Sequence, residues 1–441
     1  MRLDYYHTGN VTQELFSVDH VYIEPLPWPG NLKKCIDHSN LGKYFFEVHD
    51  LKTMDVVYSR GFNSIFGEWE TTDEAHSVNR TFQESFRFPA PNGPVEIVLK
   101  KRDDNNGFRQ IWKAVVNPKA MFVDRSNFES PAPLLELEKN GDPSRKVDFL
   151  ILGDGYTKDE MGKFEKDARR MMELLFATSP FKEHRKEFNI YAICPPAAES
   201  GVSRPSTGVY RDSPLGASYD AFGSERYLLT YDNRKLRKVA QFAPYEFVEI
   251  LANSRTYGGG GIFNLYGTVA ADSAQAGYVF VHEFGHHFAG LADEYYTSPV
   301  SYTVPDKTIE PWEPNVTTIA DAQKLKWKAQ LSPGVEIPTP WNKRTYDAHL
   351  RDYQSRREAM RAERKPEEDM EKLFAELGEF ERQFFAVEPN KNKVGAFEGA
   401  NYQSQGYYRP QLDCIMFTRS HQFCAVCQEA IRNVIGLYNG N

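Results

Sequence analysis

The sequence lacks the features that mark membrane-spanning, nucleic-acid-binding and disulfide-rich proteins. No stretch approaches the roughly 18 consecutive apolar residues that a membrane span requires, and the first residues contain no apolar core of a signal peptide. Only five cysteines occur, and this odd number leaves at least one thiol free in a monomer. The net charge of −8 argues against nucleic acid or an anionic membrane as a partner.

The composition is that of a soluble globular protein. Hydrophobic residues make up 41% and charged residues 26% of the chain, which is usual for such proteins. Aromatic residues reach 14%, which favours β-rich domains and extended binding surfaces. Because 441 residues exceed the size of one ordinary hydrophobic core, we expect two or three domains.

Residues 1–120 are predicted to form an N-terminal β-sandwich domain, because short β-prone runs follow one another without a long helical period. A hairpin turn is expected at Asn106-Gly107, since Asn-Gly readily takes positive φ. Residues 121–146 hold several prolines and charges, which is typical of a linker. The runs expected to form strands are Tyr44–Val48, Val56–Tyr58, Val95–Lys100 and Phe108–Val116.

Residues 147–441 show the pattern of an α/β domain. Apolar runs predict buried strands, and Thr157 with Glu160 forms a capping box that opens a helix of about twenty residues. A later helix, capped by Asp272 or Ser273, is expected to carry the chemically distinctive segment of the chain. The strands are expected at Val147–Leu152, Phe188–Cys194, Phe247–Ala252 and Ile262–Tyr266.

Two charged segments, Lys343–Arg364 and Glu367–Phe385, predict a helical hairpin that is divided at Pro366. We treat it as a helical insertion, at about residues 343–385, within the second domain. A short helix from Ala425 to Leu437 is expected to close the chain. The predicted fold class is therefore α+β, with a β-sandwich followed by an α/β domain that carries a helical insertion.

The segment HEFGH at His282–His286 matches the HExxH pattern. Residues four apart lie on one face of a helix, so both imidazoles can reach one ion. Glu283, beside them, is placed to activate a zinc-bound water by accepting its proton. The apolar run Tyr278–Val281 before the motif indicates a packed helix. We therefore predict one catalytic Zn²⁺ bound by His282 and His286, with Glu283 as catalytic base.

A third ligand is expected just after this helix. Gly290 can end the helix in the left-handed conformation, and the turn then returns a carboxylate toward the metal. We predict Asp293 as this ligand, with Glu294 as the alternative. His287 should point about 100° away from His286 and is not expected to bind the metal.

Met416 lies in the segment Asp413–Phe417, which can form a tight turn beneath a zinc site. The alternative is an ordinary core methionine. Because the chain also carries HExxH, a following glycine and Asp293, we favour the tight turn that places a methionine beneath the zinc, known as a Met-turn.

The glycine run Gly258–Gly261 lacks the GK[ST] ending of a phosphate loop, so nucleotide binding is not expected. It is either a plain surface loop or a flexible rim beside the strand expected at Ile262–Tyr266. Such a strand can pair with an extended peptide. In that interpretation Gly260, Gly261 and Ile262 bind substrate.

Cys424 and Cys427 form a CxxC motif. A zinc knuckle needs a second pair of ligands, and only Cys414 and His421 lie nearby in the sequence. A disulfide or buried thiols are therefore expected instead of a metal site.

The sequence resembles the IgA-peptidase family of zinc metallopeptidases, peptidase family sixty-four. Six blocks occur in order between about residues 147 and 437, and the β-rich N-terminus is similar to the family's own N-terminal domain. The blocks are FLILGDGY (Phe149–Tyr156), YGGGGIFNLY (Tyr257–Tyr266), HEFGHHFAGLADEYY (His282–Tyr296), WEPNVT (Trp312–Thr317), FEGANYQSQGYYRP (Phe397–Pro410) and Asp413–Cys427.

The resemblance implies a secreted or surface-held bacterial peptidase with a metzincin-like catalytic domain. It carries over the roles of His282, His286 and Asp293 as ligands and of Glu283 as base. An extracellular, periplasmic or cell-surface location is then expected, with a leader already removed from this chain. The resemblance does not carry over a substrate.

The predicted function is a zinc-dependent endopeptidase that hydrolyses peptide bonds of extracellular proteins. Its expected partner is a protein or peptide substrate, and the sequence does not define an oligomeric state. The alternatives are a binding protein with a structural zinc and a hydrolase of non-peptide amides. Glu283 argues against the first, because a structural zinc site needs no base and usually has four protein ligands. A possible edge strand favours peptide over other amides.

Overall fold

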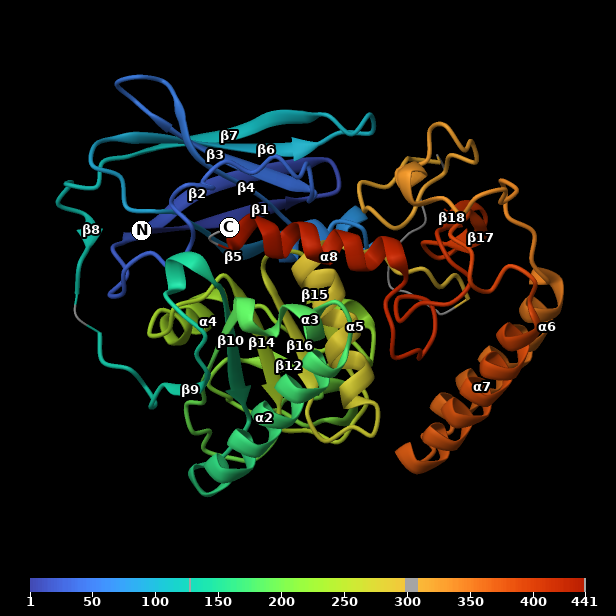
Figure 1. The fold of residues 1–441 in the computed structure, drawn as a ribbon. Helices are drawn as coiled ribbons and strands as arrows, with labels where there is room; N and C mark the ends of the chain where they lie inside the picture. The colour runs from blue at the N-terminus through green and yellow to red at the C-terminus, as the bar shows by residue number, and fades with distance from the viewer. Residues whose placement is uncertain (127, 298–307, 440–441) are drawn as a thin grey trace.

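The computed structural model describes residues 1–126, 128–297 and 308–439. The remaining residues, which fall in the predicted linker and the predicted peptidase domain, lie outside the described part of the chain. Across the described ranges the fold is mixed α+β, as predicted, with several sheets and eight α-helices (Figure 1). None of the described helices is long and apolar enough to cross a membrane.

Two four-stranded sheets form the N-terminal part. Their strands are β1 (Arg2–Asn10), β2 (Gln13–Tyr22), β3 (Tyr44–Asp50), β4 (Val56–Phe62), β5 (Arg80–Arg87), β6 (Val95–Arg102), β7 (Phe108–Val116) and β8 (Val123–Asp124). The order is β5-β1-β2-β8 in one sheet and β4-β3-β6-β7 in the other. Both sheets contribute alternate residues, such as Tyr5, Phe46 and Ile97, to one apolar cluster. The predicted hairpin is present, with Asn106 at φ 61°.

A six-stranded sheet forms the centre of the second part. Its strands are β9 (Leu135–Glu138), β10 (Val147–Asp154), β11 (Phe188–Ile193), β14 (Phe247–Ala252), β15 (Gly259–Ile262) and β16 (Tyr266–Ala270), while β12 (Ala217–Ser218) and β13 (Leu229–Thr230) form a separate pair. The order is β15-β16-β14-β10-β11-β9. The four inner strands are parallel, and the two edge strands run antiparallel to their neighbours.

The helices of this part and of the N-terminal part are α1 (Ile65–Trp69), α2 (Met161–Ala177), α3 (Phe181–His184), α4 (Asn233–Ala240), α5 (Ala276–Ala289) and α8 (Ala425–Tyr438). Both faces of the six-stranded sheet are buried, as the residues of β10 show, since they point alternately to the two faces and are all buried. Phe149 and Ile151 pack in a cluster with α2, α5 and α8, whereas Leu150 and Leu152 pack with α4 and α1 of the N-terminal part. The predicted capping box at Thr157 is present before α2.

The predicted strand at 262–266 is wrong. This segment is the turn of a hairpin, with Asn264 at φ 53°, and the strand runs through the preceding glycines as β15. The reason is the approach of α5. A Cβ atom on Gly261 would lie 2.3 Å from the carbonyl oxygen of Glu283, so only glycine lets an edge strand pass this close to the helix.

The charged segments form two adjacent helices, α6 (Lys343–Ala362) and α7 (Glu367–Val387), with Pro366 before the second, as predicted. Their apolar faces pack together, and the Tyr346 hydroxyl donates to Glu381 at 2.7 Å. The pair stands beside the main body of the molecule (Figure 1). A hairpin of β17 (Phe397–Ala400) and β18 (Gln403–Arg409) follows it.

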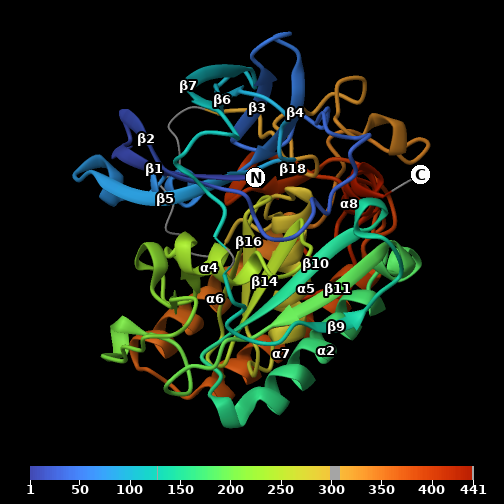
Figure 2. The ribbon, with the colours of Figure 1, turned by 90° about the vertical axis from the view of Figure 1, so that its left-hand side faces the viewer.

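The N-terminal sheets lie against the rest of the chain (Figure 2). The Arg87 guanidinium donates to the carbonyl oxygen of Tyr245 at 2.9 Å. Ile65, Phe66 and Trp69 of α1 belong to the same apolar cluster as one face of the six-stranded sheet. Residues before and after the predicted linker therefore share buried surface.

Candidate metal centre and cleft

The HEFGH segment lies in α5, as predicted. The helix begins after Gln275 and not at the predicted cap, Asp272 or Ser273, because residues 271–275 form turns in which Ser273 accepts a hydrogen bond from the Gln275 amide at 3.3 Å. It ends at Gly290, whose φ of 59° and ψ of 37° are left-handed, as expected. The chain then turns back toward the histidines.

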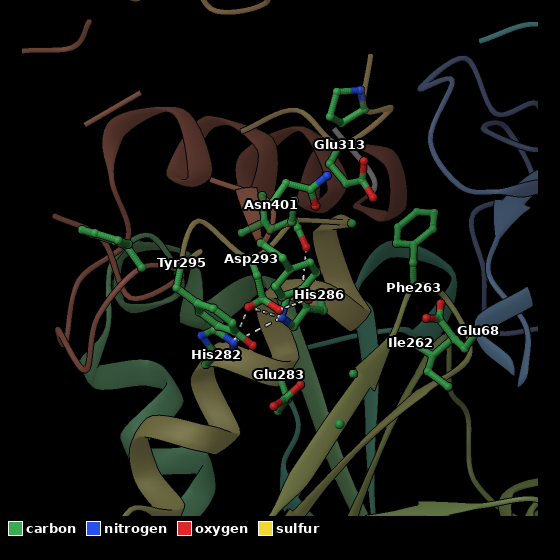
Figure 3. Close-up of a pocket in the computed structure, with 18 of the residues that line it drawn as sticks. Glu68, Ile262, Phe263, His282, Glu283, His286, Asp293, Tyr295, Glu313 and Asn401 are labelled. Atoms are coloured by element: carbon green, nitrogen blue, oxygen red, sulfur yellow. Dashed lines mark hydrogen bonds and ion pairs between the residues drawn. The ribbon is translucent and has the colours of Figure 1, made fainter. Parts of the chain in front are cut away.

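His282, His286 and Asp293 bring three ligand atoms together (Figure 3). The Nε2 atoms of the two histidines are 3.2 Å apart. Oδ1 of Asp293 lies 3.0 Å from Nε2 of His282 and 3.2 Å from Nε2 of His286. Nitrogen and oxygen ligands about 2.0–2.1 Å from a tetrahedral zinc lie about 3.3 Å from one another. The three distances therefore suit ligands of one ion.

The opposite nitrogens of the imidazoles contact backbone carbonyls. Nδ1 of His282 lies 2.9 Å from the oxygen of Ile415, and Nδ1 of His286 lies 2.5 Å from the oxygen of Leu291. Because a carbonyl only accepts, each Nδ1 carries the proton. Each Nε2 lone pair is then available to a metal.

Asp293 is a buried carboxylate with two different environments. Its Oδ2 accepts a hydrogen bond from the Tyr402 hydroxyl, whereas its Oδ1 has no hydrogen-bond partner within the described residues. A buried carboxylate oxygen without a partner is costly. A cation shared with the two imidazoles would satisfy it, so these residues fit a divalent metal.

His286 and Asp293 also interact electrostatically. Burial opposes the charge on both, yet the carboxylate raises the pKa of His286 to about 9, and His286 holds the pKa of Asp293 well below its usual range. The centre thus strongly favours positive charge beside Asp293.

Glu283 lies below the two histidines in Figure 3 and faces β15. A Cβ atom on Gly259 would lie 3.4 Å from its Cγ atom. Burial raises the pKa of the Glu283 carboxyl, although His282 and His286 oppose the shift. A raised pKa suits a carboxylate that takes up a proton during a reaction.

The three candidate metal ligands and Glu283 line one cleft of about 530 Å³. Gly260, Gly261 and Ile262, predicted to bind substrate, lie along one wall, and Ile262 appears to the right of the histidines in Figure 3. Helices α6 and α7 supply another wall. The N-terminal part also lines the cleft, a contribution that the sequence analysis missed. The N-terminal lining residues are Lys43, Asn63, Gly67, Glu68, Thr71, Arg102, Asp103, Asp104 and Asn106.

Two neighbouring side chains point elsewhere. The carboxylate of Glu294, the alternative third ligand, contacts Cys427 Sγ at 3.4 Å and is not grouped with the histidines. His287 is fully buried, with Nδ1 3.8 Å from Glu249, and does not join the metal-binding group, in agreement with the expectation.

Met416 is fully buried against α5, the helix that carries the two candidate histidine ligands. A Cβ atom on Gly285 would lie 3.0 Å from its sulfur, and its carbonyl oxygen accepts a hydrogen bond from the Glu294 amide at 2.8 Å. The segment around Met416 therefore packs beside the centre. The cysteines near it are free and buried; of the two expectations for the CxxC motif, buried thiols are present and a disulfide is absent.

The sequence analysis missed Tyr402 and Tyr295. Tyr402 follows Asp293 by 109 positions in the chain, in the turn between β17 and β18, and nothing in local spacing links the two. The Tyr295 ring stacks at 6.3 Å from that of His282. Both tyrosines lie within blocks that carry the family resemblance, which was the only available signal.

Two family models match the chain. One, described as IgA Peptidase M64, covers residues 135–435, and the other, described as Peptidase M64 N-terminus, covers residues 1–113. A comparison with curated proteins gave no match.

Proposed function

The chain belongs to the IgA Peptidase M64 family and is therefore a metallopeptidase, a hydrolase of protein or peptide substrates; from this premise we propose that it is a zinc-dependent endopeptidase acting on extracellular proteins. The observation that carries the proposal is the convergence of His282, His286 and Asp293 in an open cleft. Three protein ligands leave a fourth zinc position for water or substrate, as catalytic sites require.

The proposed chemistry assigns each residue one task. His282, His286 and Asp293 hold the ion, which when bound acidifies water and polarises a carbonyl group. Glu283 accepts the proton of the attacking water and passes it to the leaving amine. Tyr402 fixes the orientation of Asp293 through Oδ2, so that Oδ1 faces His282 and His286, where the ion would be held.

Strand β15 is the proposed docking edge for the substrate backbone. One end of its outer edge is covered, because the Leu228 amide donates to Gly259 at 3.3 Å. Beyond the other end, the Asn63 amide donates to Phe263 at 2.9 Å. Between these contacts lie Gly260–Ile262, beside Glu283, where an extended peptide can add as a strand.

The finer fold assignments belong to the same proposal. The two N-terminal sheets with their common core support a β-sandwich over residues 1–120. Residues 121–146, proposed as the linker, contain β8, which pairs with β2, and β9, which pairs with β11 of the six-stranded sheet. The site geometry and the position of Met416 against α5 support a metzincin-like domain with a Met-turn. We also propose an extracellular, periplasmic or cell-surface location, which rests on the family resemblance.

The test compares Glu283→Gln with the wild-type enzyme on a mixture of fluorescently labelled denatured proteins. The variant should keep its metal content but lose about 10²- to 10⁴-fold in activity, because an amide cannot accept the water's proton. Glu313→Gln, at another carboxylate that lines the cleft, is the matched control and should stay active. Substantial proteolysis by Glu283→Gln would refute the role of Glu283, and full activity of metal-free protein would refute zinc dependence.

A further inference from the structure

A second cluster of metal-binding groups lies next to the first. Glu294, Cys414, Cys424 and Cys427 are each at most 4% exposed, and their ligand atoms all lie within 4.8 Å of one another. Cys424 caps the N-terminus of α8, and Cys427 lies in its first turn. The cluster therefore joins Glu294 to cysteines that lie more than a hundred positions later in the chain.

Three distances within the cluster suit a tetrahedral site. Thiolates about 2.3 Å from a zinc ion lie about 3.8 Å from one another, and a thiolate and a carboxylate oxygen lie about 3.5 Å apart. The Sγ atoms of Cys414 and Cys427 are 3.8 Å apart. Oε1 of Glu294 is 3.4 Å from Sγ of Cys427 and 3.9 Å from Sγ of Cys424.

Backbone amides around the cluster favour negatively charged sulfur. The Cys424 amide donates to Sγ of Cys414 at 3.2 Å, and the Cys427 amide donates to Sγ of Cys424 at 3.4 Å. The N-terminus of α8 adds the positive end of its dipole. Thiolate is the form of cysteine that binds a metal.

The buried carboxylate of Glu294 is a second, independent indication that a cation binds at this cluster. The side-chain amide of Asn315 donates to Oε1 at 2.9 Å and orients the carboxylate toward the sulfurs. The side chain is fully buried, and Oε2 has no hydrogen-bond partner within the described residues. A buried carboxylate with an orphaned oxygen is costly unless a cation compensates it.

We propose that Glu294, Cys414, Cys424 and Cys427 bind a second, structural zinc ion, separate from the catalytic one. Four protein ligands complete a closed tetrahedral site, which leaves no position for substrate. Thiolate-rich sites select zinc over hard cations such as Mg²⁺ and Ca²⁺. The proposal does not depend on the proposed function, because the two sites share no ligand.

The alternatives fit the geometry less well. A disulfide needs sulfurs about 2.05 Å apart, whereas the Cys414 and Cys427 sulfurs are separated by 3.8 Å. A redox-active CxxC motif needs an accessible thiolate, whereas Cys424 is 4% exposed and Cys427 is fully buried.

The second ion would brace the catalytic centre. Asp293 and Glu294 are consecutive, and their carboxylates point to different sites. The Glu294 amide also donates to the carbonyl oxygen of Met416 at 2.8 Å. Zinc held by Glu294 and Cys414 would therefore fix both the segment that carries Asp293 and the turn that carries Met416.

The test measures zinc per chain by elemental mass spectrometry in full-length protein purified without chelator. Wild type should hold about two ions, and the double variant His282→Ala/His286→Ala should keep about one. X-ray absorption of that variant should show sulfur neighbours at about 2.3 Å from zinc. Cys427→Ser should lose the second ion, whereas Cys194→Ser, at a buried thiol outside the cluster, should retain both.

Several outcomes would overturn the proposal. They are a double-histidine variant without zinc, an absorption spectrum without sulfur neighbours, and an intact mass that reveals a disulfide among these cysteines. Should Cys427→Ser fail to fold, the absorption measurement on the double-histidine variant still decides the question. Loss of activity in Glu283→Gln bears only on the catalytic site and leaves this result unaffected.

Discussion

The Nδ1 atom of His282 lies 2.9 Å from the carbonyl oxygen of Ile415, a residue 133 positions later in the chain. This contact sets the tautomer of a predicted metal ligand from the segment that contains Met416. The orientation of the imidazole therefore depends on the C-terminal segment as well as on α5.

Substitution of Met416 tests this dependence. Leucine has a similar volume, so Met416→Leu should cost less than about 1.5 kcal/mol of stability and keep the metal. Met416→Asp should be far more harmful, because it buries an unpaired carboxylate against Gly285. Denaturant unfolding and metal analysis of both variants provide the measurement. Equal stability of the two would mean that Met416 is not packed beneath the centre.

Tyr402→Phe removes the hydroxyl that donates to Oδ2 of Asp293. Zinc affinity should fall about 10- to 100-fold, as is usual when a partner of a metal ligand is lost, while the fold is retained. The readout is the zinc concentration that restores half of the activity of chelator-treated enzyme. Tyr408→Phe, in the adjacent strand, is the control. A similar rise in the required zinc concentration for both variants would indicate a general loss of structure.

Asp293→Ala and Glu294→Ala should show which of the two neighbouring carboxylates binds the catalytic metal. We expect Asp293→Ala to raise the zinc concentration needed for activity more strongly, because its Oδ1 lies 3.0 Å from His282 and 3.2 Å from His286. Reactivation titrations of both variants measure this directly. The reverse order would transfer the role of catalytic ligand to Glu294.

Gly261→Ala should damage the active site through backbone displacement. The added Cβ atom would lie 2.3 Å from the carbonyl oxygen of Glu283 and 3.0 Å from Cβ of His286, so β15 and α5 must move apart. Activity should fall by at least about tenfold. Gly162→Ala, where the added atom meets nothing within 4 Å, should retain activity. Normal activity in Gly261→Ala would show that the spacing between strand and helix is not critical.

Glu14 gives a prediction about pH. Burial opposes its charge, but His7 and Lys101 lower its pKa to about 2 from an ordinary 4.5. Its stabilising effect is therefore complete above about pH 4.5 and declines as the pH falls toward 2. Glu14→Gln should destabilise the protein by roughly 1–3 kcal/mol at pH 7.

The difference in the free energy of unfolding between wild type and Glu14→Gln should become smaller as the pH drops below 4.5. Urea unfolding at several pH values measures it. Glu129→Gln, at an exposed position, should differ from wild type by no more than about 0.5 kcal/mol throughout. If the loss of stability in Glu14→Gln stayed constant down to low pH, the lowered pKa assigned to Glu14 would be wrong.

Local sequence predicted those parts of the site that one helix determines. The four-residue spacing of His282 and His286 follows from helical periodicity, and Gly290 followed from the need for a left-handed residue at a helix end. The strand at Phe247–Ala252 was predicted with the bounds that the structure shows, because the segment is apolar except for Glu249.

The remaining features depend on contacts between distant segments. The glycines of β15 became strand residues because α5 approaches them, which no pattern within residues 258–266 reveals. The sequence offered only Cys414 and His421 near the CxxC motif, because Glu294 lies 130 positions before Cys424; the fold brings its carboxylate beside the three cysteines. The cleft includes Arg102 and Asn63 because the N-terminal sheets dock on the second part of the chain.

The contact between His282 and Ile415, which are 133 positions apart, limits when the active site can form during synthesis of the chain. A ribosome that adds roughly 5–20 residues per second makes the HEFGH helix many seconds before residue 415 exists. During this interval the emerging chain holds the histidines without the carbonyl that orients one of them. The predicted active site can therefore be assembled only after residue 415 has been made, and hydrolytic activity cannot appear before that point.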